Sequence, residues 1–130
     1  MKHLIPKDKF DIATAEKLTG YSYDQVKPIV PELLTWIQDM NWPVAGPVSN
    51  YLRSISENLS EDIVKILRGN DEQWKYWCIS VFALSADKLP TRAVIDEIKR
   101  IAENPTQEEI SEEVHELAFE FVSDIEKNAP

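Results

Sequence analysis

Apolar residues recur along this chain at the spacing of a helix face rather than in the alternation of a strand. Val94, Ile98, Ile101 and Ala102 follow the spacing i, i+4, i+7 and i+8, which places them on one side of a helix. Strand signals are weak, because glycine occurs only three times and no Asn-Gly or Asp-Gly pair joins two alternating runs. The pattern therefore predicts an all-α protein.

Proline, glycine and capping residues divide the apolar pattern into about seven helices. Breaks fall at Gly20, at Trp42-Pro43 and at Asn104-Pro105. The segment 71–84 is apolar over most of its circumference, so it belongs in the middle of the core. We expect helices over residues 11–18, from 28 or 31 to 40, and over 43–55, 60–69, 71–84, 91–102 and 106–125.

The last of these helices combines a capping box with a long apolar stripe. Thr106 and Glu109 have the spacing at which the two residues cap each other's backbone amides. The face opposite the stripe is nearly all glutamate. The apolar stripe is expected to consist of Ile110, Val114, Leu117, Ala118, Phe121 and Ile125.

Short connections between successive helices favour antiparallel hairpins. Asp39-x-x-Trp42 recurs as Asp71-x-x-Trp74 at an offset of 32 residues, just below the period of helical repeat proteins, roughly 33 to 47 residues. Chance and a shared capping aspartate would explain the recurrence equally well. We predict one domain over residues 1–130, built as stacked antiparallel hairpins in a HEAT-like α-α superhelix after a short first helix. A non-repeating helical bundle is the alternative.

Length, cysteine content and hydropathy indicate the cellular compartment of the protein. A chain of 130 residues can bury a core without metals or disulfides. Cys78 is the only cysteine, so no intramolecular disulfide forms and a cytoplasmic location is expected. Charges follow the first apolar residues at once, which excludes a signal-peptide core. No apolar stretch approaches the roughly 20 residues needed to cross a bilayer, so we predict no membrane insertion.

The charge of the chain narrows the class of partner. The net charge is −9, and residues 104–130 hold eight acidic side chains against Lys127 alone, a contribution of −7. Proteins that bind nucleic acid usually carry a basic patch, and none is found. We expect no nucleic-acid partner, and we expect any protein partner to be basic.

Catalytic and metal-binding patterns are scarce. Glu112 and His115 have the Glu-x-x-His spacing of di-iron bundles, but no second copy of the motif exists. At 100° per residue both lie roughly 100° or more from the centre of the apolar stripe, so a solvated acidic face is the better interpretation. Phosphate loops, Cys-x-x-Cys and nucleophile elbows are absent, and Cys78 lies on an apolar face, where a thiol is inert. We assign no catalytic residue, metal or cofactor.

One aromatic segment is the best candidate for a binding site. Trp42 lies at a turn between helices, where its ring either folds onto the core or stays partly exposed, and partly exposed tryptophans are typical binding hot spots. The alternative is that these rings only pack the ends of the hairpins, with Asp39 bracing the turn. The candidate binding residues are Trp36, Asp39, Asn41 and Trp42, joined by Trp74 and Tyr76 if the hairpins stack in register.

Four segments carry a resemblance to a known family. They are residues 5–11 (IPKDKFD), 28–34 (PIVPELL), 38–45 (QDMNWPVA) and 71–77 (DEQWKYW). In these the chain resembles the bacterial family labelled domain of unknown function 5071. The resemblance covers nearly the whole chain and implies a stand-alone bacterial protein with HEAT-type hairpins. It transfers no catalytic or ligand residue.

Two hypotheses for function follow. The leading one is a non-enzymatic protein-protein interaction module, in its most concrete form an inhibitor or immunity-type protein that blocks a basic target. The other is a small hydrolase or metal-dependent enzyme whose carboxylates converge only in the fold. A concave pocket with at least two inward carboxylates would favour the enzyme, and complete burial of Trp42 and Trp74 would exclude the aromatic anchor.

Overall fold

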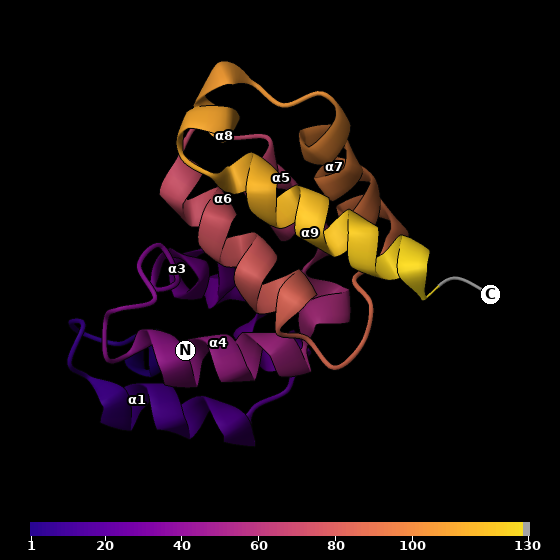
Figure 1. Ribbon diagram of the computed structural model, residues 1–130. Coiled ribbons are helices and arrows are strands. Elements are labelled where there is room, and N and C mark those ends of the chain that lie inside the picture. The colour runs from indigo at the N-terminus through magenta and orange to yellow at the C-terminus, as the bar shows by residue number, and fades with distance from the viewer. Residues whose placement is uncertain (129–130) are drawn as a thin grey trace. The chain divides into compact units, whose positions relative to one another are not determined.

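A computed structural model describes residues 1–128, and that part of the chain is helical with no strand (Figure 1). The all-α prediction is therefore confirmed, and the expected count of about seven helices is close. No described helix is long and apolar enough to cross a membrane. The α-helices are α1 (Ile12–Glu16), α2 (Tyr23–Val26), α3 (Val30–Thr35), α4 (Ala45–Ser54), α5 (Ser60–Leu67), α6 (Glu72–Ile79), α7 (Arg92–Glu103), α8 (Gln107–Ser111) and α9 (Val114–Lys127).

The chain divides into two compact units, an N-terminal unit over Met1–Asn58 and a C-terminal unit from Leu59 onward. The N-terminal unit contains α1 to α4, and the C-terminal unit contains α5 to α9. The assignment of residues 1–130 to a single domain stays a prediction.

In the N-terminal unit the helix expected to reach Met40 ends at Thr35, so that boundary is wrong. The amides of Trp36, Ile37 and Gln38 bond to carbonyls three residues back rather than four, which tightens and ends the helix. The Asp39 carboxylate then accepts from the Asn41 amide at 2.8 Å and closes a separate turn. The next helix starts at Ala45, two residues later than expected.

The C-terminal unit consists of two antiparallel hairpins that stack on each other. Helices α5 and α6 contact each other, and only residues 68–71 lie between them in the chain. His115 at the start of α9 bonds to the Ala102 carbonyl at the end of α7 (3.1 Å), so α7 and α9 are antiparallel. The Ser60 and Thr91 hydroxyls, at the starts of α5 and α7, lie 2.6 Å apart. The first helices of the two hairpins therefore run side by side and parallel, and α6 likewise packs against α9 (Figure 1).

The apolar segment 71–84 contributes to the core of the C-terminal unit, but it is not one α-helix, because a π-helix over Ser80–Leu84 follows α6. Asp71 caps α6 by accepting from the Trp74 amide at 3.0 Å. Cys78, Ile79 and Phe82 are buried, whereas the rings of Trp74 and Trp77 are half-buried. Burial raises the pKa of the Cys78 thiol, and at neutral pH it stays protonated and unreactive.

The helix predicted over residues 106–125 is in fact two helices. The predicted capping box of Thr106 and Glu109 starts α8, but Glu113 adopts a left-handed conformation, with φ of 66° and ψ of 11°, before α9 begins. Because of this joint, the buried face of α9 does not continue along α8. Ile110, expected in the buried stripe, is 50% exposed, whereas Val114, Ala118 and Phe121 are buried as expected.

The left-handed conformation of Glu113 can be tested by substitution with glycine. A left-handed conformation costs a residue with a Cβ roughly 1–2 kcal/mol, and glycine avoids this cost but loses more backbone entropy on folding. Glu113→Gly is therefore expected to raise the free energy of unfolding by about 0.5–1 kcal/mol, measured by urea denaturation. The matched control is Glu112→Gly, where φ is −97°, and there the same change should destabilise. Equal effects at both positions would contradict the left-handed joint.

Candidate functional site

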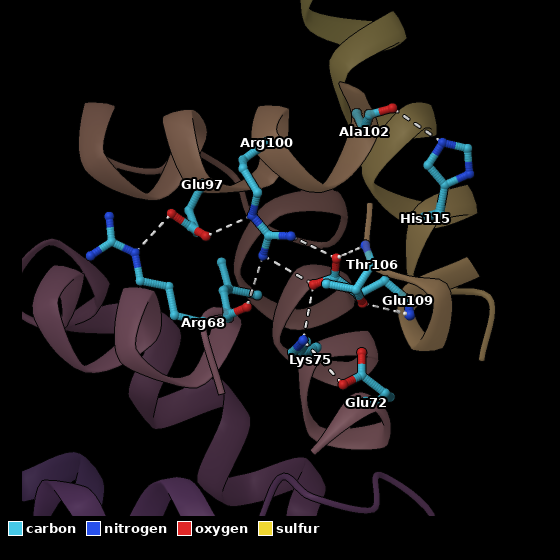
Figure 2. A network of polar contacts seen from close by, with 10 residues as sticks. Arg68, Glu72, Lys75, Glu97, Arg100, Ala102, Thr106, Glu109 and His115 are labelled. Carbon is cyan, nitrogen blue, oxygen red and sulfur yellow. Dashed lines mark hydrogen bonds and ion pairs between the residues drawn. The ribbon is translucent and has the colours of Figure 1, made fainter. Parts of the chain in front are cut away.

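The C-terminal unit contains a cleft of about 500 Å³ in which ionic side chains from three helices and from the loop after α5 meet (Figure 2). The loop after α5 forms one rim and the first turn of α6 another, while α7 and the start of α8 supply the remaining walls. The charged residues that take part in its ion pairs are Arg68, Glu72, Lys75, Glu97, Arg100 and Glu109.

Glu109 is the centre of this network, and its side chain is completely buried. One carboxylate oxygen accepts from Arg100 Nη1 at 2.6 Å and from the Thr106 amide at 2.8 Å. The other accepts from Lys75 Nζ at 2.9 Å and from Arg100 Nη2 at 3.0 Å. Arg100 therefore grips the carboxylate with two nitrogens, the geometry in which guanidinium and carboxylate pair most strongly.

Local sequence explains why Glu109 points inward. The Thr106 hydroxyl accepts from the Glu109 amide at 3.1 Å, and the carboxylate returns the contact to the Thr106 amide. This reciprocal capping box holds the glutamate against the first turn of α8. The carboxylate is thereby fixed where α6 and α7 present their cations.

The same contacts keep Glu109 ionised. Burial by itself raises the pKa of a carboxyl, but the hydrogen bonds from Arg100, the Thr106 amide and Lys75 outweigh it and lower the pKa of Glu109 to about 2. The pairing with Glu109 in turn raises the pKa of Arg100. At neutral pH the centre of the network is therefore permanently charged.

Further ion pairs extend outward from Arg100 and Lys75, so that cations and carboxylates alternate. Arg100 Nε donates to Glu97 (3.0 Å), and the other oxygen of Glu97 accepts from Arg68 Nε (3.0 Å). Lys75 also pairs with Glu72 Oε2 at 3.1 Å. Three cations thus face three carboxylates. Within the described residues the one buried side-chain oxygen or nitrogen that lacks a hydrogen-bond partner is Glu72 Oε1.

This arrangement is better suited to holding the helices together than to proton transfer. A general acid or base needs a pKa near the working pH and a free oxygen that can reach the substrate. Glu109 meets neither condition, since its pKa is about 2 and both oxygens are occupied. The cleft therefore brings carboxylates together, as the enzyme hypothesis requires, but neutralises them.

Comparison with known proteins identifies the family of this chain. Residues 4–122 match the model of a family described as Domain of unknown function (DUF5071). The chain belongs to this family. No curated protein matches the sequence. The DUF5071 match spans the capping box and every ion-paired residue of the cleft.

Four of the predicted binding residues lie together in the N-terminal unit. The rings of Trp36 and Trp42 meet edge to face, with centroids 5.7 Å apart, and both are half-buried. Asn41 is exposed, and Asp39 braces the turn through the Asn41 amide. Both Trp42 and Trp74 keep part of their surface exposed, so the condition that would exclude an aromatic anchor is not met.

The other two predicted residues lie in the C-terminal unit. Trp74 and Tyr76 are half-buried on α6, and the Tyr76 ring meets Trp77 edge to face at 5.0 Å. Asp71 caps a helix whereas Asp39 closes a turn, so the two Asp-x-x-Trp segments differ in local structure. A continuous surface formed by all six residues stays a prediction.

The Glu-x-x-His pair does not converge. Glu112 is exposed, whereas one nitrogen of His115 contacts the Ala102 carbonyl and its ring lies 6.4 Å from that of Phe119. In the described part of the chain, no group of three or more His, Cys, Asp or Glu residues is arranged to hold a metal ion.

Sequence reasoning missed the network because its members look like ordinary surface charges. Glu109 was identified as a capping residue but counted among the solvated glutamates, and Lys75 lies between two aromatic residues on α6. The available signal was the capping box itself, which fixes the direction of the glutamate side chain. The cations that surround it come from segments 9 and 34 residues away, beyond local pattern.

Removal of the central carboxylate tests the network. Glu109→Gln leaves the buried Lys75 and the half-buried Arg100 without their main counter-charge, and it should lower the free energy of unfolding by about 3 kcal/mol. The neighbouring control Glu108→Gln, at an exposed position, should change it by less than about 0.5 kcal/mol. Equal losses in urea denaturation would show that the ion pairs do not stabilise the fold.

The pKa of Glu109 also predicts how stability depends on pH. The folded-state pKa of about 2 lies below the value of about 4.3 for glutamate in an unfolded chain. The stabilisation is therefore complete above pH 4.3 and is lost as the pH falls toward 2. The difference in unfolding free energy between the wild type and Glu109→Gln should shrink over this window. A difference that persists unchanged at pH 2 would contradict the ionic origin.

Proposed function

We propose that the protein is a non-enzymatic interaction module that binds a basic protein partner. This proposal is supported by a difference between two groups of carboxylates, one paired with cations and one not. In the described residues, three carboxylates of the cleft, those of Glu72, Glu97 and Glu109, are paired with cations, whereas no ion pair or hydrogen bond engages those of a second group. This group, called here the acidic face, consists of the exposed residues Glu112, Glu113, Glu116, Glu120 and Asp124.

Unpaired surface charge of one sign acts on partners at a distance. It steers an oppositely charged protein toward the face and makes association sensitive to ionic strength. Carboxylates that are already neutralised inside the protein, such as Glu109, contribute little to such steering. An inhibitor or immunity-type protein for a basic target is the most specific form of this proposal, and it rests on charge alone.

The aromatic turn of the N-terminal unit would supply apolar contact. Trp36 and Trp42 present part of their rings beside the exposed Asn41, a composition typical of interface hot spots. The stacked hairpins of the C-terminal unit agree with the HEAT-like architecture proposed for the whole chain, in which repeats present extended binding surfaces. A bacterial, cytoplasmic setting is part of the same proposal.

A small hydrolase is the second candidate, favoured by one observation. Four carboxylates line the cleft, those of Glu72, Glu97, Glu108 and Glu109, and one oxygen of Glu72 has no partner among the described residues. Against it, the two deepest carboxylates, Glu97 and Glu109, are engaged by arginine on both oxygens. Charge pairing of this kind stabilises a fold without leaving a group for catalysis.

Partner capture from native cell extract tests the interaction module. The immobilised protein should retain a partner at low salt and release it at high salt, since the attraction is screened. Reversal of three charges on the acidic face, Glu116→Lys with Glu120→Lys and Asp124→Lys, should abolish retention.

The matched control reverses three exposed carboxylates of the N-terminal unit, Glu16, Asp24 and Glu32, and changes the net charge equally. This control should keep the partner if the acidic face is the binding surface. Equal loss in both variants would show that only total charge matters. Retention that is independent of salt and of both variants would contradict the proposal.

A further inference from the structure

The outer side of α9 combines charge with an exposed aromatic ring. Phe119 is 60% exposed, and it lies three residues after Glu116 and one before Glu120. Residues at i, i+3 and i+4 of a helix lie on the same face, with Cβ atoms about 5–6 Å apart. Glu116 therefore neighbours both the exposed ring and Glu120, whereas Phe119 and Glu120 are adjacent residues whose side chains diverge around the helix.

A second exposed phenylalanine in the same chain provides a comparison. Phe10 is 68% exposed, and Lys9 Nζ lies 5.3 Å from the centre of its ring. This distance is within the range of a cation–π interaction. Among the described residues no cation covers Phe119 in this way, and its one recorded ring contact is His115 at 6.4 Å.

We propose that Phe119, Glu116 and Glu120 form a docking site for an arginine side chain of the partner. This inference rests on the proposed function and specifies the chemistry that the acidic face recognises. A guanidinium is planar and weakly hydrated, so it stacks on an aromatic ring while its N–H groups pair with carboxylates. Lysine supplies the same charge but no plane to stack.

The geometry of α9 favours this use. A guanidinium that lies over Phe119 is within reach of Glu116, one turn before the ring, and Glu120 lies one turn after Glu116 and adds its negative charge. Carboxylates accept two parallel hydrogen bonds from arginine, and a solvent-exposed cation–π contact adds to them. The docking site thus distinguishes arginine from other cations by stacking, and the acidic face supplies the attraction.

Two synthetic peptides test the proposal. They have the same length, the same neutral spacer residues and the same number of cations, which are all arginine in one peptide and all lysine in the other. Affinity is measured by fluorescence anisotropy at low ionic strength. The protein should bind the arginine peptide about two- to fivefold more tightly, the ratio expected for an exposed cation–π contact.

Two variants test whether the preference for the arginine peptide depends on the Phe119 ring. Phe119→Leu keeps an apolar side chain and should remove the preference, because it lowers the affinity for the arginine peptide more than the affinity for the lysine peptide. Phe10→Leu changes the other exposed phenylalanine and should leave the preference intact. NMR titration of the wild type with the arginine peptide should shift amide signals around residues 116–120, and this measurement does not depend on how any variant folds.

The outcomes separate this inference from the proposed function. Equal binding of both peptides, a preference that survives Phe119→Leu, or amide shifts confined to other helices would overturn the arginine site. Binding of both peptides that is lost after charge reversal on the acidic face would leave the interaction module standing. Failure of both peptides to bind would count against the arginine site and against the attraction for basic partners alike.

Discussion

The C-terminal unit depends on one buried carboxylate. Glu109 connects three helices at once, because Lys75 comes from α6, Arg100 from α7 and the carboxylate itself from the start of α8. A charge without a partner in this position would be strongly destabilising. The unit is therefore constrained to keep both cations close, and the way in which its hairpins meet follows from that requirement.

Local patterns predicted the helices well and their interruptions poorly. The predicted capping box of Thr106 and Glu109 is present, because capping depends on residues within one turn. The early end of α3, where the backbone bonds shorten to three residues, and the left-handed joint at Glu113 have no comparable signal in the sequence. Apolar periodicity cannot show such a joint when residues on both sides keep helical spacing.

The same contrast between local and long-range information explains which features of the candidate sites could be predicted from the sequence. Aromatic residues and acidic composition are visible in the sequence, and the structure places Trp36 beside Trp42 and keeps both partly exposed. What the sequence could not show is which carboxylates are neutralised. Glu109 and Glu116 both occur in the acidic C-terminal segment, yet one is fully buried among cations and the other is exposed.

The burial of Cys78 makes the protein well suited to labelling. Its thiol is 1% exposed and is the only one in the chain, and burial keeps it protonated. A cysteine introduced on the surface would therefore be the single nucleophile for a maleimide dye or a nitroxide spin label. Distances between two such labels, one in each unit, would report how the N-terminal and C-terminal units are arranged in solution.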